Sequence, residues 1–235
     1  MKIEGSKIIV TGGSSGSGKA TARLLQKKGA QVLITGRDTD RLKKAAMEIG
    51  CSWLVADVSR QEEVDKTFGW VKENWNNQLD VLINNAGIGE FARVADTPMD
   101  SYQRVMAVNF FGPVMMVKAA LPLMQTGGKG TIMNIASTSS QKGFVSGSAY
   151  AASKFALRGF TQSLMEEVRS QHIRVFQVNP SEVSTAFGNP ERRERRETES
   201  KLGPEQIAQT IFSLLELPDK AFIPELSVWA TNPTL

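Results

Sequence analysis

The chain has 235 residues, of which 41% are hydrophobic and 22% charged, with a formal net charge of +4. This length and balance predict one globular domain spanning residues 1–235, and they exclude a disordered or fibrous chain. No apolar run reaches the length of a membrane span and the N-terminus lacks a signal-like apolar stretch, so a soluble, cytoplasmic protein with no membrane contact is expected.

The single cysteine and the single histidine limit the chemistry that the chain can perform. Cys51 permits no intrachain disulfide and is expected as a small buried apolar residue. His172 lies between a predicted helix end and a strand start, the edge of an open α/β sheet opposite the ligand crevice. We therefore expect no metal site and no Ser-His-Asp hydrolysis. The charges are mostly dispersed and no nucleic-acid-binding motif is present, so no nucleic-acid partner is expected.

Short β-rich apolar runs alternate with longer amphipathic segments along the whole chain. This βαβ pattern predicts an α/β fold, a doubly wound parallel sheet of about seven strands with helices on both faces. The strands are predicted at Lys7 to Thr11, Gln31 to Thr35, Ser52 to Ala56, Val81 to Asn84, Thr131 to Ala136, Arg174 to Asn179 and Leu226 to Ala230.

Local signals predict where some of the helices begin. Ser59, with Glu62 three residues later, resembles a capping box, and Thr97 precedes Pro98 as a cap before a proline at the first helical position. Two long helices are predicted near Met99 to Met124 and Ser148 to Gln171. A highly charged segment, residues 188–201, interrupts the pattern before the last helix.

The first predicted strand is followed by the glycine-rich run Gly12-Gly13-Ser14-Ser15-Gly16-Ser17-Gly18. Such a turn at a helix N-terminus lets backbone N–H groups approach a pyrophosphate, which favours a dinucleotide site. A phosphate loop of the NTPase type is the alternative, since four residues separate Gly13 from Gly18-Lys19. That motif then requires Ser or Thr as a magnesium ligand, and Ala20 stands there instead.

Tyr150 and Lys154 are four residues apart on a predicted helix and so share one face. A nearby ammonium group favours the ionised form of a phenol, so Lys154 is expected to lower the pKa of Tyr150 and allow proton transfer near neutral pH. The spacing alone arises often by chance and needs supporting residues.

Three motifs together resemble the short-chain dehydrogenase/reductase family: Thr11-Gly12-x-x-x-Gly16-x-Gly18, Asn84-Asn85-Ala86-Gly87 and Tyr150-x-x-x-Lys154. The resemblance covers nearly the whole chain. It implies a Rossmann fold and an oxidoreductase that transfers a hydride between a nicotinamide cofactor and a carbonyl or alcohol.

The resemblance implies a catalytic group of Asn109, Ser137, Tyr150 and Lys154. Tyr150 would exchange a proton with the carbonyl oxygen, and Ser137 would hydrogen-bond that oxygen where negative charge develops. Lys154 would also bind the nicotinamide ribose. Asn109 would hold a water molecule that links Lys154 to solvent, or it is simply an amide that packs between helices.

The cofactor is expected to be NADP, with NAD the less favoured choice. The second strand ends in Gly36-Arg37 where an acidic residue would bind the ribose of NAD, and Arg37, with Ser14 and Ser15, suits a 2′-phosphate. The alternative for Arg37 is a solvated residue at a helix start. By resemblance, the further cofactor contacts are Gly12, Gly16, Ser17, Gly18, Asp57, Val58, Asn85, Ala86, Gly87, Val183 and Thr185.

The resemblance also places a substrate lid around residues 186–202 and a homodimer or homotetramer through the two long helices. The basic run containing Arg192, Arg193, Arg195 and Arg196 is expected to be a solvated helix face, with an acidic carrier as the alternative. A cofactor-binding sensor or interaction protein on the same fold is the alternative function.

Overall fold

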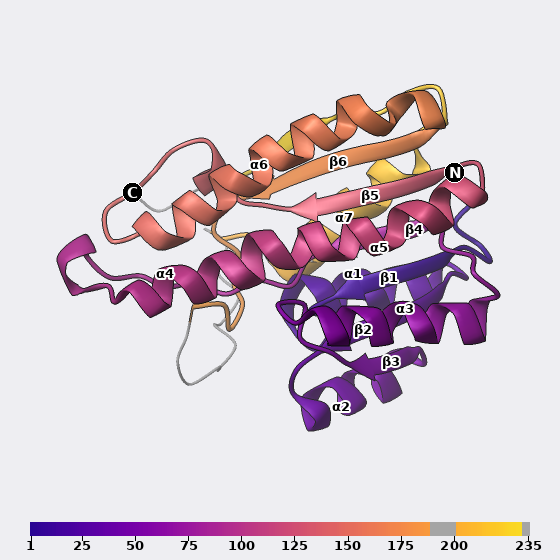
Figure 1. Cartoon of the computed structure of the whole chain (residues 1–235), viewed down its shortest axis with the longest axis horizontal. Coiled ribbons are helices and arrows are strands. Elements are labelled where there is room, and N and C mark those ends of the chain that lie inside the picture. Colours follow the sequence, from indigo (N-terminus) through magenta and orange to yellow (C-terminus); the bar gives the residue numbers. More distant parts are fainter. Residues whose placement is uncertain (189–200, 232–235) are drawn as a thin grey trace.

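The computed structural model describes residues 1–188 and 201–231. In these residues seven parallel strands form one sheet, in the order β3-β2-β1-β4-β5-β6-β7 (Figure 1). The strands are β1 (Lys7–Thr11), β2 (Gln31–Gly36), β3 (Ser52–Val55), β4 (Val81–Asn84), β5 (Gly130–Ile135), β6 (Ile173–Pro180) and β7 (Glu225–Val228). The predicted strands therefore all exist, with ends that differ by at most two residues.

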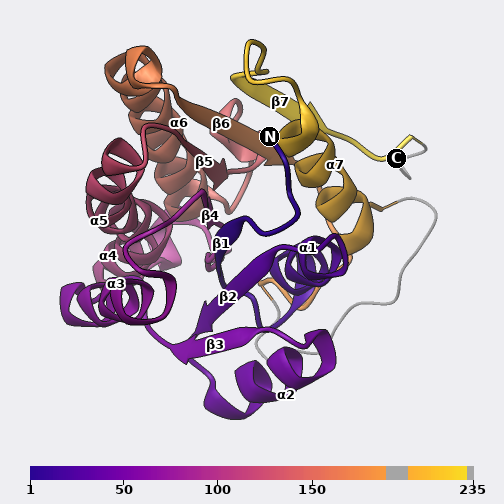
Figure 2. The ribbon, with the colours of Figure 1, turned by 90° about the vertical axis from the view of Figure 1, so that its right-hand side faces the viewer.

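Helices cover both faces of the sheet, as Figure 2 shows along the strands. One face carries α1 (Gly16–Lys27), α2 (Thr39–Ile49) and α7 (Pro204–Glu216), and the other carries α3 (Gln61–Trp75), α4 (Met99–Met106), α5 (Gly112–Thr126) and α6 (Ser148–Val168). Each face encloses its own apolar core. The fold is thus the doubly wound Rossmann fold that the alternating pattern predicts.

The central strands are buried on both sides, which explains their continuous apolar character. Every residue of β4, β5 and β6 is buried. Strand β3, at one edge of the sheet, is instead exposed or half-buried along its length. Short helical turns are found at η1 (Val94–Asp96), η3 (Thr138–Ser140) and η4 (Arg169–Gln171).

Both predicted helix starts are wrong in detail. Helix α3 begins at Gln61 with Arg60 as its N-cap residue, because the Ser59 hydroxyl donates to Asp57 instead of capping the helix. Helix α4 begins at Met99 with Pro98 in an extended conformation at the N-cap position. The Thr97 hydroxyl donates to the carbonyl of Arg93 at 2.8 Å, closing the preceding turn.

The predicted long helix near Met99 consists of α4, a π-helical turn η2 (Ala107–Phe111) and α5 in succession. Met99–Thr126 is the one stretch among the described residues that is long and apolar enough to cross a membrane by length and composition alone. It packs beside α3 and α6 against the sheet, which accounts for much of its apolar character.

The order of the strands determines where a ligand fits. Strand β1 lies between β2 and β4, so the chain reverses its direction of winding at β1. In open α/β sheets, ligands bind beyond the carboxyl ends of the strands at such a switch point. The glycine-rich turn follows β1, and the segments that follow β4 and β5 lie at the same edge.

Candidate active site

Tyr150 and Lys154 lie on the first turns of α6, next to the carboxyl end of β5. Both side chains are buried, with 8% and 4% of their surface exposed. The Lys154 ammonium donates to the carbonyl oxygen of Ile135 at 2.9 Å, which fixes α6 to the end of β5. Its nitrogen lies 5.7 Å from the centre of the Tyr150 ring. The structure therefore brings this predicted pair together on one helix face.

The prediction that Lys154 lowers the pKa of Tyr150 is wrong in this structure. Burial raises the pKa of Tyr150 to about 12, and a hydrogen bond with the Ser137 side chain opposes that rise only in part. Burial also lowers the pKa of Lys154 to about 8. Removal from water disfavours both charged forms, and this effect outweighs the proximity of the two groups. Tyr150 therefore holds its proton firmly at neutral pH.

Ser137 lies two residues beyond β5 and caps the short turn η3. Its Oγ accepts from the backbone N–H of Ser139 at 3.1 Å and donates to the Ser139 hydroxyl at 3.2 Å. The Ser137 side chain is close enough to Tyr150 to lower the pKa of the phenol in part, so two of the predicted catalytic hydroxyls lie near each other at the carboxyl edge of the sheet. A polarised carbonyl oxygen between them would accept from both.

Asn109 lies in the π-helical turn η2 and is fully buried. Its Oδ1 accepts from the N–H of Ile88 at 2.8 Å, and its Nδ2 donates to the carbonyl of Ile88 and to the Ser153 hydroxyl. Pro113 has no N–H to donate to the carbonyl of Asn109, which suits a local widening of the helix. The amide thus joins the turn after β4 to α6.

Ser153 is a buried residue of the site that the motifs do not identify. Its hydroxyl donates to the carbonyl of Tyr150 at 2.7 Å and accepts from Asn109. Only its position directly before Lys154 could have indicated from the sequence that Ser153 belongs to the site.

The glycine-rich turn is tied to the segment after β4 by hydrogen bonds. Thr11 Oγ1 accepts from the N–H groups of Asn85 and Ala86, each at 3.0 Å, and Asn85 Nδ2 donates to the carbonyl of Thr11. Gly12 has φ = 67°, and a Cβ there would lie 2.9 Å from Ala86 Cα. A side chain at Gly18 would clash with Asn85 and the carbonyl of Gly12. Close packing of two loops therefore requires these glycines.

The first turn of α1 suits an anionic group. Among the residues that the structure describes, none caps it through a side chain, and its first turn contains no acidic residue. Free backbone N–H groups and the positive end of the helix dipole attract phosphate. Ala20 is buried on α1, where its methyl group offers no metal ligand, so the phosphate-loop alternative gains no support. The turn fits the pyrophosphate of a dinucleotide.

Arg37 and Asp57 lie beside each other beyond β2 and β3. Arg37 is 45% exposed and its guanidinium lies 3.6 Å from the Asp57 carboxylate. Although partial burial favours the protonated carboxyl, hydrogen bonds from Ser59 and the charge of Arg37 lower the pKa of Asp57. Ser14 also lies near, since a Cβ at Gly36 would be 3.6 Å from its hydroxyl. An adenosine 2′-phosphate placed here would meet one arginine and one hydroxyl.

The remaining predicted contacts divide into core and rim positions. Val58 is buried and packs against Gly112. A Cβ at Gly87 would lie 3.4 Å from Asn109 Oδ1 and 3.8 Å from Lys154 Nζ, so this glycine faces the catalytic group. Thr185 lies against Gly16. Val183, just before the predicted lid, forms a β-bridge with Leu202 at the end of the lid. Of that lid, residues 189–200, with the basic run, lie outside the described residues.

Three half-exposed phenylalanines form a cluster beside the Tyr150 ring, and of these only Phe187 lies within the predicted substrate lid. Phe91 and Phe187 have ring centres 5.5 Å and 5.6 Å from that of Tyr150, and Phe144 lies 6.1 Å from Phe91. We call Phe91, Phe144 and Phe187 the aromatic cluster. Its members follow β4, β5 and β6, and they cover the buried phenol.

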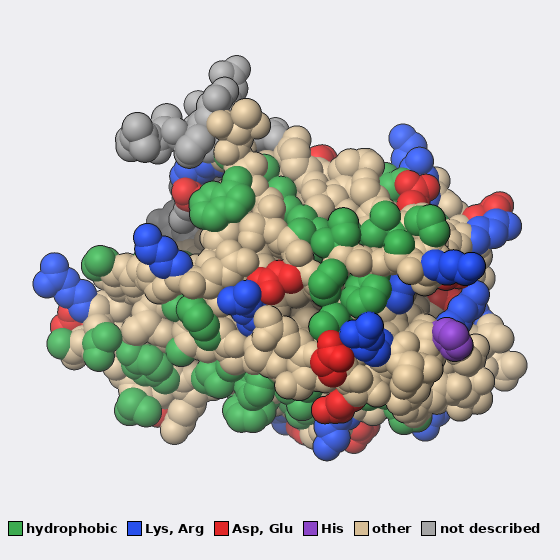
Figure 3. All heavy atoms as spheres, turned by 90° about the horizontal axis from the view of Figure 1, so that it is seen from above, with side chains coloured by type: hydrophobic (Ala, Val, Ile, Leu, Met, Phe, Trp, Pro, Cys, Tyr) green, Lys and Arg blue, Asp and Glu red, His purple; other side chains and the backbone are tan. Residues whose placement is uncertain are grey.

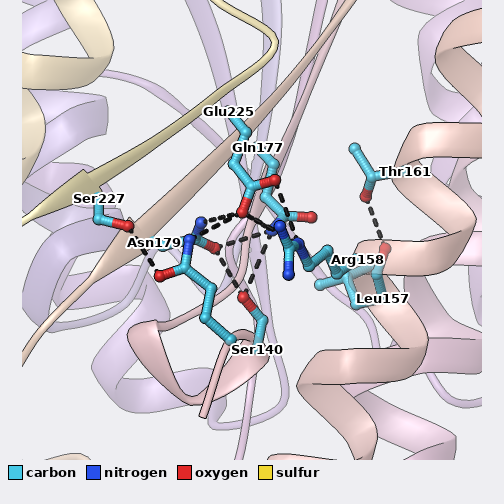
Figure 4. Close-up of polar contacts among 9 residues, drawn as sticks. Ser140, Leu157, Arg158, Thr161, Gln177, Asn179, Glu225 and Ser227 are labelled. Atoms are coloured by element: carbon cyan, nitrogen blue, oxygen red, sulfur yellow. Dashed lines mark hydrogen bonds and ion pairs between the residues drawn. The ribbon is translucent and has the colours of Figure 1, made fainter.

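A second polar network, drawn in Figure 4, lies around Glu225 and joins elements that also carry the site. Glu225 on β7 accepts from Asn179 at 2.8 Å, from Gln141 at 3.0 Å and from Arg158 at 3.1 Å. Asn179 in turn accepts from Ser140, the last residue of η3. Arg158 lies one helical turn after Lys154. The network therefore connects β6 and β7 to the two elements that follow Ser137 and carry Tyr150.

His172 lies where the sequence predicts, at the opposite edge of the sheet. It helps to line a hollow of about 410 Å³ together with Met1, Arg174 and Asp219. The Arg174 guanidinium donates to the carbonyls of Leu215 and Leu217, so it is already engaged. This hollow is therefore separate from the candidate active site.

A glycine-rich turn at the switch point of a parallel sheet, beside a buried Ser-Tyr-Lys group, defines a nucleotide-binding oxidoreductase. The sequence model of the short chain dehydrogenase family matches residues 6–196. The chain belongs to this family and is accordingly a dehydrogenase or reductase.

Named relatives agree with this assignment. Carbonyl reductase family member 4 of Xenopus laevis is 36% identical over 214 residues, which cover 89% of this chain and 90% of that protein. An uncharacterized oxidoreductase of Staphylococcus aureus is 32% identical over 226 residues, covering 94% and 95%.

Solved structures share the whole fold. An alcohol dehydrogenase from the archaeon Thermococcus sibiricus, complexed with 5-hydroxy-NADP, superposes with a TM-score of 0.91 at 28% identity and covers 99% of both chains. A metagenomic short-chain oxidoreductase in complex with NADP has a TM-score of 0.84 at 30% identity and covers both chains completely.

The lowered pKa of Lys154 predicts that Lys154→Met stabilises the protein. At about pH 7 the folded chain buries an ammonium group, and removing it should raise the free energy of unfolding by about 1 to 3 kcal/mol. As the pH rises from about 8 to the ordinary lysine pKa of 10.5, folded Lys154 loses its proton while the unfolded lysine keeps it. The wild type therefore gains stability, and the stability difference between Lys154→Met and the wild type shrinks. Urea unfolding at several pH values measures this.

Lys43→Met, at an exposed lysine of α2, is the matched control and should show no such pH-dependent difference. A Lys154→Met protein less stable than wild type at neutral pH would contradict the assigned cost of burial.

Proposed function

We propose that this protein is an NADP-dependent oxidoreductase of a carbonyl and alcohol pair, with Tyr150 as the general acid and base. The observation that carries the proposal is the meeting of Ser137, Tyr150 and Lys154 at the sheet edge that also holds the uncapped start of α1. A proton donor and a phosphate-binding turn are thereby on the same side of the molecule.

The chemistry assigned to each residue follows from its surroundings. Bound NADPH supplies the hydride that reduces the carbonyl carbon. Tyr150 donates its proton to the carbonyl oxygen, and Ser137 stabilises the negative charge that develops there. The raised pKa of Tyr150 means that the free phenol is protonated at neutral pH, the form that a general acid requires. Lys154 and Asn109 hold the floor of the site at Gly87, where the nicotinamide ribose would lie.

Preference for NADP over NAD is supported by the end of β2. An acidic residue at the end of β2 would repel a 2′-phosphate, and this chain instead has the half-exposed guanidinium of Arg37 there. Ser14 lies against the neighbouring Gly36. Two solved relatives of the fold are in complex with NADP or a derivative of it. We assign Arg37, Ser14 and Ser15 to the 2′-phosphate, and Asp57 and Val58 to the adenine end.

Substitution of Tyr150 by phenylalanine tests the proposed function. Tyr150→Phe removes one oxygen and should reduce NADPH-dependent carbonyl reduction by at least about a hundredfold, as expected for loss of a general acid. The dissociation constant for NADPH should stay within about threefold, because the phenol is not needed to hold the phosphates. Absorbance of NADPH with a panel of carbonyl compounds measures the first, and fluorescence titration the second.

Tyr102→Phe is the matched control, since Tyr102 is the other tyrosine of the chain and hydrogen-bonds Ser148 at 2.6 Å. Tyr150→Phe with undiminished turnover would remove Tyr150 from its role. NADPH binding without reduction of any carbonyl by the wild type would favour the sensor alternative.

The cofactor preference is tested by Arg37→Gln. Loss of one charge-assisted contact should weaken NADPH binding by about tenfold or more, while NADH binding changes by less than about twofold. Arg23→Gln is the control. Arg23 lies farther along α1 and, like Arg37, is a half-exposed arginine with a carboxylate partner, which here is Glu48 on α2. Equal weakening of NADPH and NADH would contradict the assignment of Arg37 to the 2′-phosphate.

We also propose a dimer or tetramer through α4, α5 and α6. Met99 on α4, Phe111 at the end of η2 and Phe155 on α6 are 68%, 53% and 45% exposed. Figure 3 shows hydrophobic side chains spread between charged ones across the surface of the molecule on the α6 side. Large apolar side chains exposed together are typical of protein interfaces.

Size-exclusion chromatography with light scattering tests the assembly. The expected mass is about two or four times the 25.7 kDa of the chain, and Phe155→Glu should shift it towards the monomer. Detection of the monomer alone in the wild type would refute the proposal.

A further inference from the structure

The aromatic cluster lies where any substrate of Tyr150 must bind. Phe91, Phe144 and Phe187 come from three different connections after β4, β5 and β6. The rings of Phe91 and Phe187 contact that of Tyr150, and Phe144 packs against Phe91. They are 44%, 46% and 38% exposed, so each ring keeps one part in contact with Tyr150 or its neighbours and another part in solvent. A ligand that enters here would bury these exposed ring surfaces.

Glycines shape the seat of Phe91. A Cβ at Gly89 would lie 2.6 Å from the Phe91 ring, and one at Gly188 would lie 2.5 Å from it. Gly188 also has φ = 70°, a conformation that side chains rarely adopt. Two segments distant in the sequence therefore leave space for the same ring, which makes the cluster a built feature of the site and not a chance contact.

Glu90, the neighbour of Phe91, has its carboxylate engaged with α4. The Glu90 carboxylate accepts from Arg104 at 2.9 Å and from Ser101 at 3.3 Å, and both partners lie on α4. Val145, beside Phe144, is 85% exposed and extends the apolar rim. The surroundings of Tyr150 thus favour an apolar group over a carboxylate or phosphate.

The position of the Tyr150 hydroxyl restricts the substrate further. A phenol oxygen lies at the edge of its own ring, and that ring contacts Phe91 and Phe187. A carbonyl oxygen that accepts the Tyr150 proton therefore brings the groups on the carbonyl carbon within about one ring width of the cluster. Aromatic pairs gain about 0.5 to 1.5 kcal/mol beyond simple burial in offset or edge-to-face arrangements.

We propose that the aromatic cluster binds the aryl group of ketones or aldehydes whose aromatic ring is attached directly to the carbonyl carbon, and of the corresponding alcohols. Edge-to-face contacts with Phe91 and Phe187 distinguish an aromatic ring from a saturated ring of the same size. This inference rests on the proposed function, because it names the substrate class of the same site.

The test compares acetophenone with cyclohexyl methyl ketone, which differ only in the aromaticity of one ring. The ratio of kcat/KM for the two ketones is measured in the wild type, in Phe91→Leu and in Phe187→Leu. Leucine preserves apolar bulk and removes the aromatic face, so each variant should lower the aryl preference by about two- to tenfold. Dividing the ratio of the variant by that of the wild type cancels the different intrinsic reactivity of the ketones.

Phe222→Leu is the matched control. Phe222 also packs against another aromatic ring, Phe176 at 5.8 Å, but it lines the hollow at the opposite edge of the sheet. The ratio of kcat/KM for the two ketones in Phe222→Leu should equal that of the wild type. Circular dichroism and thermal melting establish that each variant is folded, and two independent cluster variants keep the test valid if one of them is not.

Binding measured without turnover separates this inference from the proposed function. Saturation-transfer NMR with the NADP-loaded protein should give tighter binding of acetophenone than of cyclohexyl methyl ketone, and Phe91→Leu should remove the difference. If no carbonyl is reduced but this binding preference is found, the proposed function fails and the aryl site stands. If carbonyls are reduced and the ratio is the same in the wild type and both cluster variants, the aryl site is overturned.

Discussion

The hydrogen bond from the buried Lys154 ammonium to the carbonyl of Ile135 is the contact on which the site depends. It joins the first turns of α6 to the end of β5, and Ser137 follows that strand by two residues. Tyr150, one helical turn before Lys154, is thereby placed against Ser137. Since the donor and the acceptor are both shielded from water, this hydrogen bond offsets part of the cost of burying the ammonium group.

Burial of Tyr150 and Lys154 costs folding stability and also sets the pKa values of both groups. Removal from water raises the pKa of Tyr150 and lowers that of Lys154. A neutral phenol therefore lies close to an ammonium group that loses its proton more readily than an exposed one. The aromatic cluster supplies much of that shielding around the phenol. The same rings would desolvate a bound carbonyl and strengthen its hydrogen bonds with Tyr150 and Ser137.

The sequence predicted the strands well because buried parallel strands are continuous apolar runs that little else in the chain imitates. Helix starts were less reliable, since the Ser59 hydroxyl had a nearby alternative partner in Asp57. The effect of Lys154 on the pKa of Tyr150 was misjudged because spacing on a helix gives proximity but not burial. Phe91, Phe144 and Ser153 were missed because phenylalanine and serine occur in many loops and helices without a functional role.

The sequence by itself determined the βαβ order, the glycine-rich turn after the first strand and the residue types of the catalytic group. Each of these is local, since strand pattern, turn conformation and helical spacing depend on residues near one another in the chain. Only the tertiary structure decided which groups are buried, that Glu225 supports the loop after Ser137, and that three distant phenylalanines gather beside Tyr150. Burial and contacts between distant segments arise when separate elements pack together, and no short stretch of sequence encodes that packing.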